Sequence, residues 1–327
     1  MDMLAGLLDG PKARGAYLLK SVLNPPWSLR VEDRAPLSVI ALVRGSGWLL
    51  PDGGEPARIG PGDVAVVRGP VPYAFADSPD ARGPWITIGP DQRCSTEAGE
   101  DVTDSLSLGV RTWGADHEEP GASVVLSGTY QAPSEVGRRL LGTLPTVLVR
   151  PAGAADATLV GLLASEMGRD EPGQELVLDR LLDLLLIGVL RAWLAAPGPG
   201  APAWHRAQGD PVVGVALGLL HADPAHGWTV AELARRAGVS RAALARRFTE
   251  LVGEPPVAYL TGWRLALAAD LLRAGDATVA TVARRVGYGS AFALSTAFKR
   301  VRGVSPQEFR AGVRPQDAGT PGTVVLA

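Results

Sequence analysis

The sequence predicts an α+β protein with an antiparallel β-barrel at the N-terminus, flanking helices, and an all-α domain at the C-terminus. Three observations lead to this prediction. Short apolar runs punctuated by Gly, Pro and Asp occupy residues 16–109, as expected for many short strands. The apolar spacing becomes helical over residues 156–196, and two copies of a paired-helix pattern occupy residues 228–303.

Composition and charge indicate a soluble protein of two domains. The chain has 327 residues, of which 46% are hydrophobic and 20% charged. Its net charge is −2, but acidic residues dominate before residue 210 and basic residues dominate over 210–313. A basic C-terminal domain favours a polyanion as its partner. There is no signal-peptide layout and no apolar run long enough to span a bilayer, so we expect a cytoplasmic protein without membrane contact.

The clearest predicted strands are four short runs, at residues 37–43, 48–50, 64–67 and 85–88. Turn signals separate them, with Pro-Asp-Gly-Gly at 51–54 and Gly-Pro-Gly-Asp at 60–63. Strands of this length and spacing indicate a small antiparallel barrel or sandwich.

Two stretches of this region resemble the cupin domain: RGSGWL at 44–49 and GGEPARIGPGDVAVVRGPVPYAF at 53–75. Metal-dependent cupin enzymes hold their ion with imidazole and carboxylate groups inside the barrel. Tyr73 stands where the second cupin motif usually has a histidine, and the chain's four histidines lie outside the barrel, at His117, His205, His221 and His226. We therefore expect a sensor or support with no enzyme activity, metal or cofactor. The alternative is a metal-dependent cupin enzyme with carboxylate ligands, fused to the basic C-terminal domain.

Aromatic and basic residues of the barrel form a candidate effector pocket, because ligand sites are mostly apolar with a few charged anchors. The candidates are Trp48, Arg68, Tyr73, Phe75 and Trp85, with Trp113 and Arg111 nearby in the sequence. The competing interpretation is that these rings only fill the core. Cys94, the single cysteine, follows Arg93, which favours a redox-reactive thiolate, whereas an inert buried thiol is the alternative. One cysteine excludes an internal disulfide and is consistent with a reducing cytosol.

Two helices are predicted between residues 156 and 196, separated by the breaker Glu171-Pro172-Gly173. The second carries leucine around most of its circumference, so more than one of its faces needs cover. We expect one face to form a dimer interface, the alternative being complete burial within one subunit. Residues 197–209, PGPGAPAWHRAQG, have the composition of a linker.

Residues 228–253 carry the pattern of two short helices joined by a tight turn. Apolar residues fall on one face of the first helix, at Val230, Leu233, Ala234 and Ala237, and Thr229 with Glu232 predicts a capping box at its start. Gly238 ends this helix, and Ser240 caps the second, whose apolar side carries Leu244, Phe248 and Leu251. This is the helix-turn-helix pattern, in which the second helix enters the DNA major groove.

The same pattern returns further along the chain. Val279, Val282, Ala283 and Val286 repeat the first face, Gly287 takes the place of Gly238, and Leu294, Phe298 and Val301 repeat the second. Two copies in register on a basic segment indicate a DNA-binding domain much more strongly than one copy, and a plain helical bundle is the competing interpretation.

Three stretches resemble the DNA-binding domain of the AraC/XylS family of transcriptional regulators: GEPPVAYLTGWRLALAADLL at 253–272, TVATVARRVGYGS at 278–290 and AFKRVRGVSPQEFR at 297–310. Residues 1–196 resemble the cupin-type sensor of one branch of that family. The resemblance implies a ligand- or redox-responsive dimer that binds double-stranded DNA, and RNA polymerase as a further partner of an activator. It also implies a linking helix, about 256–274, that holds two recognition helices in successive segments of the major groove. A constitutive DNA-binding protein with a vestigial sensor stays open as an alternative.

The resemblance nominates base-reading positions near the start of each recognition helix: Arg241, Ala242, Ala245 and Arg246, then Ala291, Phe292, Ser295 and Thr296. Arginine pairs bidentately with guanine, so Arg246 and then Arg241 are the expected specificity carriers. Family members often have glutamate at Gly289 and arginine at Thr296, so the second helix departs from the pattern. We expect more backbone positioning from it. The candidate backbone contacts of both helices are Ser240, Arg247, Ser290, Lys299 and Arg300.

The predicted organisation along the chain has five parts. These are a sensor barrel (1–155), a helical dimerisation region (156–196), a linker (197–209), a DNA-binding domain (210–313) and a flexible tail (314–327).

Overall fold

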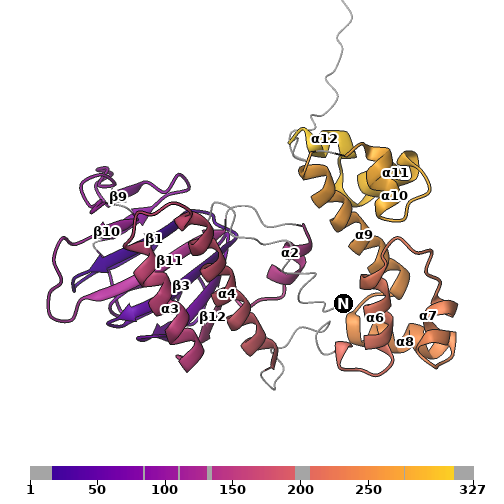
Figure 1. Ribbon diagram of the computed structural model, residues 1–327, viewed down its shortest axis with the longest axis horizontal. Coiled ribbons are helices and arrows are strands. Elements are labelled where there is room, and N and C mark those ends of the chain that lie inside the picture. The colour runs from indigo at the N-terminus through magenta and orange to yellow at the C-terminus, as the bar shows by residue number, and fades with distance from the viewer. Residues whose placement is uncertain are drawn as a thin grey trace, which may run out of the picture. The chain divides into compact units, whose positions relative to one another are not determined.

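The computed structural model describes residues 17–83, 85–109, 111–130, 135–195, 207–275 and 277–312. They form two units (Figure 1): the N-terminal unit lies within residues 11–133 and 140–201, and the C-terminal unit within residues 134–139 and 202–327. Most of the predicted linker, including His205, and the predicted tail lie outside the described residues. No helix in the described part of the chain is long and apolar enough to cross a membrane.

The first sheet of the N-terminal unit has the spatial order β10-β1-β11-β3-β6-β12. Its strands are β1 (Tyr17–Leu23), β3 (Leu37–Arg44), β6 (Val64–Arg68), β10 (Thr112–Gly114), β11 (Ser123–Tyr130) and β12 (Val147–Arg150). Strand β3 pairs with β11 on one side and β6 on the other, and its first six residues are buried. A central strand covered on both faces needs a continuous apolar run, which the sequence supplies here.

The second sheet has the order β5-β4-β7-β2-β8-β9. Its strands are β2 (Ser28–Val31), β4 (Gly47–Pro51), β5 (Ala57–Ile59), β7 (Tyr73–Ala76), β8 (Ile86–Ile88) and β9 (Cys94–Thr96). In β4 the burial alternates along the strand, so Gly47, Leu49 and Pro51 are buried. Both sheets contribute side chains to one hydrophobic core, including Ile40 and Val125 from the first sheet and Leu29 and Phe75 from the second.

The predicted antiparallel barrel is present only in part. The strand pairings form two sheets that face each other, and two pairs, β1 with β10 and β2 with β8, run parallel. The alternation of apolar residues determines which face of a strand is buried, but it does not determine the neighbour of the strand. The choice between a closed barrel and two sheets therefore depended on long-range pairing.

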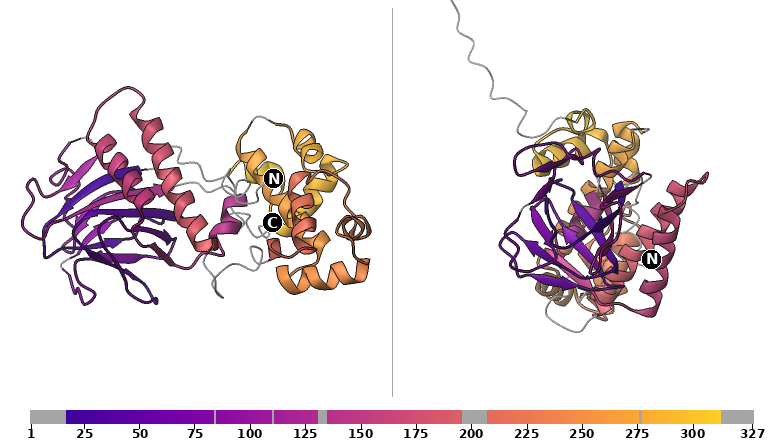
Figure 2. Two further views of the ribbon diagram at one scale, coloured as in Figure 1. Left: turned by 60° about the horizontal axis from the view of Figure 1, so that its bottom comes forward. Right: turned by 90° about the vertical axis from the view of Figure 1, so that its left-hand side faces the viewer.

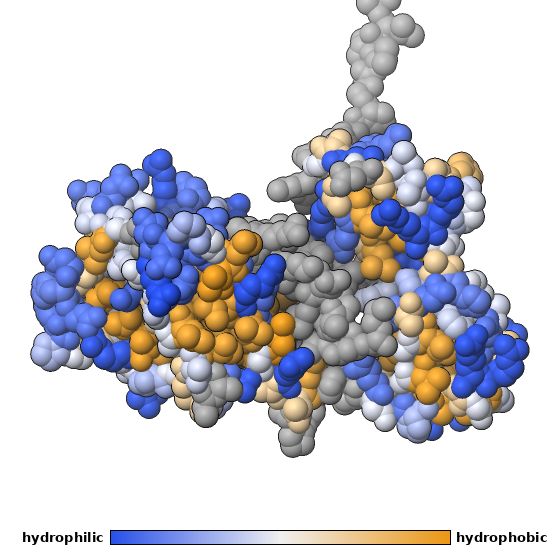
Figure 3. Space-filling model, in the orientation of Figure 1, coloured by the Kyte–Doolittle hydropathy of each residue, from blue (hydrophilic) through white to orange (hydrophobic). Residues whose placement is uncertain are grey.

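Two helices, α3 (Ala154–Met167) and α4 (Gln174–Ala195), pack against each other and against the first sheet (Figures 1 and 2). Gly128 of β11 permits the close approach of α4, because a Cβ atom there would lie 2.6 Å from Cδ2 of the buried Leu182. The sheet covers one side of α4, while Leu162 of α3 and Leu176, Val177 and Leu184 of α4 stay exposed. Figure 3 shows hydrophobic side chains gathered over these two helices.

The C-terminal unit consists of helices. They are α2 (Glu135–Leu141, which begins in this unit), α6 (Val213–Ala222), α7 (Val230–Arg236), α8 (Arg241–Val252), α9 (Pro256–Arg273), α10 (Val279–Arg285), α11 (Ala291–Arg302) and α12 (Pro306–Arg310). The pairs α7–α8 and α10–α11 are the two predicted helix pairs, and α9 is the long helix between them. Leu244 and Phe248 of α8 and Leu294 and Phe298 of α11 are fully buried.

Two details of the helix pairs differ from the prediction. Thr229 caps α7 by accepting the Glu232 N–H, but the Glu232 carboxylate does not complete a capping box and instead bonds His226 and Arg236. The apolar spacing predicts Val301 on the buried face of α11, yet its side chain is exposed. It lies near the end of the helix, where the apolar face has fewer neighbours to cover it.

Candidate nucleic-acid interface and internal cavity

The two recognition helices α8 and α11 begin and end in the same way. The Ser240 side chain accepts the Ala243 N–H at 3.2 Å, and the Ser290 side chain accepts the Ala293 N–H at 3.1 Å. Gly253 and Gly303 end the helices in the left-handed region, at φ 91° and 78°, which residues with a Cβ rarely adopt. Both serine hydroxyls therefore have a structural role as caps, in addition to the predicted role at the DNA backbone.

The start of α8 is exposed to solvent and carries two arginines there. Arg241, Ala242 and Arg246 are exposed, whereas Ala245 is half-buried. Arg246 lies 3.7 Å from Glu250 one turn later, a solvent-exposed pair that a nucleic acid could displace at little cost. Arg241 and Arg246 are therefore accessible in the way that base readers must be.

Arg247 has a different environment from its two neighbouring arginines. Its Nη2 lies 2.6 Å from Oδ2 of Asp210, and its Nε donates to the same oxygen at 2.8 Å. The Asp210 carboxylate also accepts the N–H groups of Val212 and Val213 at the start of α6. Arg247 thus joins α8 to α6, and this ion pair competes with the predicted phosphate contact.

The start of α11 is apolar and accessible. Phe292 is 80% exposed, the largest exposed fraction among the exposed large hydrophobic side chains of the described residues. Thr296, Lys299 and Arg300 are also exposed, whereas Ala291 is half-buried. The Ser295 hydroxyl donates to the Ala291 carbonyl at 2.8 Å, so its proton is used inside the helix. This helix therefore offers DNA an aromatic ring and two cationic side chains, but no long side chain that could form hydrogen bonds with base edges.

A further set of exposed basic side chains was not predicted from the sequence. Arg284 and Arg285, in the last turn of α10, are exposed, and Arg235 takes the equivalent exposed place in α7. The signal was available, because Ala-Arg-Arg recurs at the same place in both copies. Arg236 is less free, since it pairs with Glu232 and stacks over the Trp228 ring.

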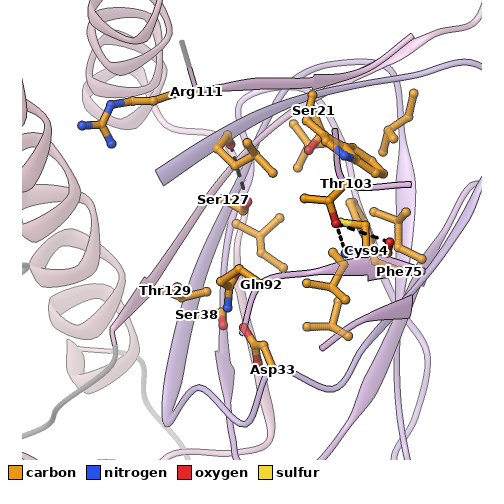
Figure 4. Close-up of a pocket in the computed structure, with 18 of the residues that line it drawn as sticks. Ser21, Asp33, Ser38, Phe75, Gln92, Cys94, Thr103, Arg111, Ser127 and Thr129 are labelled. Atoms are coloured by element: carbon orange, nitrogen blue, oxygen red, sulfur yellow. Dashed lines mark hydrogen bonds between the residues drawn. The ribbon is translucent and has the colours of Figure 1, made fainter. Parts of the chain in front are cut away.

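A cavity of about 180 Å³ lies in the N-terminal unit between the sheets (Figure 4). Tyr73 and Phe75, two of the five predicted pocket residues, line it together with Trp113. Trp48 and Arg68 do not line it, and Trp85 lines a second hollow nearby. Strand alternation explains the difference for Trp48, because the neighbouring Leu49 is the residue of β4 that joins the core.

The polar side chains at one end of the cavity were not predicted. Figure 4 shows Asp33, Ser38 and Gln92 gathered there, while Cys94, Phe75 and Thr103 lie at the other end. Asp33 is buried, and its negative charge adds to burial in raising the pKa of the Tyr73 phenol above its ordinary value. Arg111 lines the cavity, but its guanidinium points away from the space and lies 3.2 Å from Glu175.

Cys94 is buried at the cavity wall. Its N–H donates to the Thr103 hydroxyl at 2.8 Å. Burial, with a smaller effect from the charge of Asp101, raises the pKa of the Cys94 thiol to about 11. Arg93 does not activate the thiol, because it pairs with Asp91 and Asp101. This environment favours the inert thiol over the reactive thiolate.

Among the described residues, no group of three or more His, Cys, Asp or Glu side chains is arranged to hold a metal ion. His117 is exposed and pairs with Asp116 and Glu119, which raises its pKa, mainly through the Asp116 hydrogen bond. His221 is buried against Tyr259, with its Nε2 2.7 Å from the phenol oxygen. His226 bonds Glu232.

Known proteins resemble both units. Residues 2–195 match the family described as Cupin, and residues 233–312 match the family described as Helix-turn-helix domain. An AraC-like transcription regulator of Streptomyces antibioticus is 34% identical, over 95% of this chain and 98% of its own. The HTH-type transcriptional regulator AlkR of Acinetobacter baylyi is 28% identical, over 95% and 99%. The crystal structure of the DNA-binding domain of AdpA with a target DNA is 36% identical, covers 33% of this chain and 96% of that domain, and has a TM-score of 0.30.

Proposed function

The chain belongs to the family of AraC-type DNA-binding transcription regulators with an N-terminal cupin domain, and on this premise we propose that it reads DNA as a ligand-responsive homodimer. The observation that carries the proposal is the pair of recognition helices. Both α8 and α11 have a serine cap, a buried Leu and Phe, and an exposed first turn. Two such helices in one subunit are suited to two successive segments of the major groove.

The two helices contribute differently to this proposed readout. Arg246 and Arg241 of α8 are exposed and long enough to pair with guanine edges. In α11 the accessible group is Phe292, which offers an apolar contact to a thymine methyl group, while Lys299 and Arg300 offer charge to phosphates. Specificity would therefore come mainly from α8, and α11 would contribute affinity and shape.

The proposed dimer surface is the exposed side of α3 and α4. Leu162, Leu176, Val177 and Leu184 expose between 45% and 65% of their surface there, although α4 buries eight other residues. Apolar groups gathered on one face favour a protein contact over solvent. A twofold dimer would present four recognition helices to two half-sites, which increases affinity and selectivity.

The cavity supports the proposed response to a small molecule. It is a mostly apolar space with a few polar groups, as ligand sites commonly are. A chain with this function acts in the cytoplasm on double-stranded DNA, and on RNA polymerase if it activates, and it catalyses no reaction. Iron or manganese bound to the purified protein, with turnover of a substrate, would favour the fused cupin enzyme instead.

The test is a selection of genomic fragments bound by the purified full chain, followed by titration of the best site at two salt concentrations. A recurring pair of half-sites, with binding lost when either half is mutated, is the expected result. Salt-sensitive binding with no sequence preference would contradict the proposal. DNA affinity unchanged by any ligand or oxidant would favour the constitutive protein with a vestigial sensor.

A further inference from the structure

The buried carboxylate of Asp33 has no cationic partner among the described residues. Asp33 is 7% exposed, and its Oδ1 accepts the Ala35 N–H at 2.9 Å. A buried carboxylate with one neutral hydrogen bond remains poorly stabilised, because burial removes most of its hydration. Asp33 lines the cavity, so a bound molecule could supply the missing positive charge.

The protein itself does not bring a cation to this end of the cavity. Arg111 is the one basic residue among the described residues that line the cavity, and it turns outward to Glu175 (Figure 4). The second carboxylate of the lining, Asp104, is exposed at the rim. The interior is therefore negative, so a ligand carboxylate would be repelled and an ammonium group attracted.

Gln92 adds a second requirement for the ligand. Its side-chain nitrogen is buried and has no hydrogen-bond partner, and Figure 4 shows the side chain beside Ser38 and Asp33. A buried donor without an acceptor costs free energy that a ligand oxygen would recover. The matching head group therefore combines a positive nitrogen with a neighbouring oxygen.

The remainder of the cavity sets the size and polarity of the ligand body. Apolar side chains from both sheets, including Leu29, Ile40 and Phe75, face the space. An apolar cavity of about 150 Å³ is known to hold benzene. The volume of about 180 Å³ therefore fits a single ring with a short polar head group.

We propose that this cavity binds a small amino alcohol with a ring-sized apolar body, whose ammonium group lies against Asp33 and whose oxygen accepts from Gln92. The biological role of this ligand rests on the proposed function, because the ligand would be the effector of the regulator. The chemistry of the cavity does not depend on that role, so binding and regulation are tested separately.

The experiment uses the full chain and four probes with the same ring: phenylethanolamine, phenethylamine, phenylethanol and phenylacetate. Isothermal titration measures the dissociation constant of each. We expect phenylethanolamine to bind most tightly, phenethylamine next, and phenylacetate at least tenfold more weakly than either amine.

The variant Asp33→Asn keeps an oxygen for the Ala35 N–H but removes the charge, and we expect it to weaken the binding of both amines at least tenfold. Asp104→Asn makes the same change at the exposed rim, and we expect it to change the dissociation constants of the amines less than threefold.

Three results would overturn the proposal: tighter binding of phenylacetate than of the amines, equal effects of Asp33→Asn and Asp104→Asn, or no binding of any amine. The comparison of probes on the unmodified chain stands even if Asp33→Asn fails to fold. DNA titrations on the same preparations separate this proposal from the proposed function. If amines bind but DNA affinity does not change, the proposed ligand class is supported and ligand-responsive regulation is contradicted. If the chain binds DNA sequence-specifically but binds no amine, the proposed regulator is supported and the proposed ligand class is overturned.

Discussion

Glu135 and Arg273 form an ion pair inside the C-terminal unit, with Glu135 Oε1 2.6 Å from Arg273 Nη2, although they are 138 positions apart in the chain. The carboxylate is 4% exposed and also pairs with Arg302 at the end of α11. The Glu135 N–H donates to Asp270 of α9 at 2.7 Å. The start of α2 is thus tied to the linking helix and to the second recognition helix.

Replacing Glu135 with glutamine should destabilise the C-terminal unit. Glu135→Gln leaves Arg273 and Arg302 facing a neutral amide, and because both arginines are partly solvated we expect a loss of about 1 to 3 kcal/mol in the free energy of unfolding. Urea unfolding followed by circular dichroism measures it. The matched control is Glu250→Gln, which breaks an exposed pair with Arg246 and should cost less than about 0.5 kcal/mol. Equal losses in the two variants would contradict the prediction.

The same variant has a pH signature. Burial by itself would raise the pKa of Glu135, but Arg302, with Arg138 and Arg273, holds it below its ordinary value of 4.5. A carboxyl group whose pKa is lowered by folding stabilises the protein above the unfolded pKa, and this contribution disappears as the pH falls through the folded pKa. The stability difference between the wild type and Glu135→Gln should therefore be constant near neutral pH and shrink below pH 4.5.

Arg246→Ala should reduce specific DNA binding without reducing general affinity to the same degree. Removing a side chain that pairs with a guanine edge costs about 1 to 3 kcal/mol at the specific site. Lys299→Ala should instead weaken specific and random DNA alike and lower the salt dependence by about one counterion. Titrations of both variants on the selected site and on a scrambled site, at two salt concentrations, measure this. Parallel losses on both sites for Arg246→Ala would remove it from the base readers.

Alanine substitutions at the two phenylalanines of α11 should affect different properties, folding stability in one case and DNA binding in the other. Phe298 is fully buried, so Phe298→Ala should cost about 3 to 5 kcal/mol of folding stability. Phe292 is 80% exposed, so Phe292→Ala should leave stability within about 0.5 kcal/mol but weaken DNA binding by about 1 kcal/mol. Val257→Ala, at an exposed apolar position of α9, is the control for DNA binding. An unchanged DNA affinity for Phe292→Ala would show that the ring does not reach the duplex.

Cys94 should react slowly in the folded protein. With a pKa of about 11, only about one thiol in ten thousand is ionised at pH 7, and burial limits access further. We expect iodoacetamide to alkylate the native chain at least about 100-fold more slowly than the chain in denaturant. Mass spectrometry gives both rates directly, because Cys94 is the single cysteine. Comparable rates would reopen the redox role of this residue.

Leu184→Glu should dissociate the proposed dimer while leaving the subunit folded. Leu184 lies on the exposed side of α4, so a carboxylate there is hydrated in the monomer but desolvated in the dimer. Sedimentation equilibrium at micromolar concentration should change from dimer to monomer. Val71→Glu makes the same change at another exposed position of the N-terminal unit and should leave the dimer intact. If the wild-type chain is itself a monomer at this concentration, the proposed dimer is contradicted.

The helix pairs of the C-terminal unit could be predicted from the sequence because the features that specify them lie close together in the chain. The serine caps, the glycine ends and the apolar spacing each act within one or two turns of helix. The strand over residues 37–43 was predictable for the same reason, because its burial on both faces needs a local run of apolar residues. Long-range partners left no such signal. The sequence predicts a phosphate contact for Arg247 but does not indicate its ion pair with Asp210. It also places Arg111 near the pocket, which Arg111 does line, but does not indicate that its guanidinium pairs with Glu175.

The family, the order of the helices and the exposure of Arg241 and Arg246 on α8 followed from the sequence, since periodicity, caps and motifs involve neighbouring residues. Ala245, Ala291 and Ser295, which were also nominated as base readers, are half-buried. Three features depended on the tertiary structure: the pairing of strands into two sheets, the ion pair of Glu135 with Arg273, and the proximity of Asp33 and Gln92 in one cavity. Asp33 precedes β3 and Gln92 lies in the turn between β8 and β9, so no sequence spacing relates them. Their proximity follows from which strands pair and in which register, a choice made by the whole core at once.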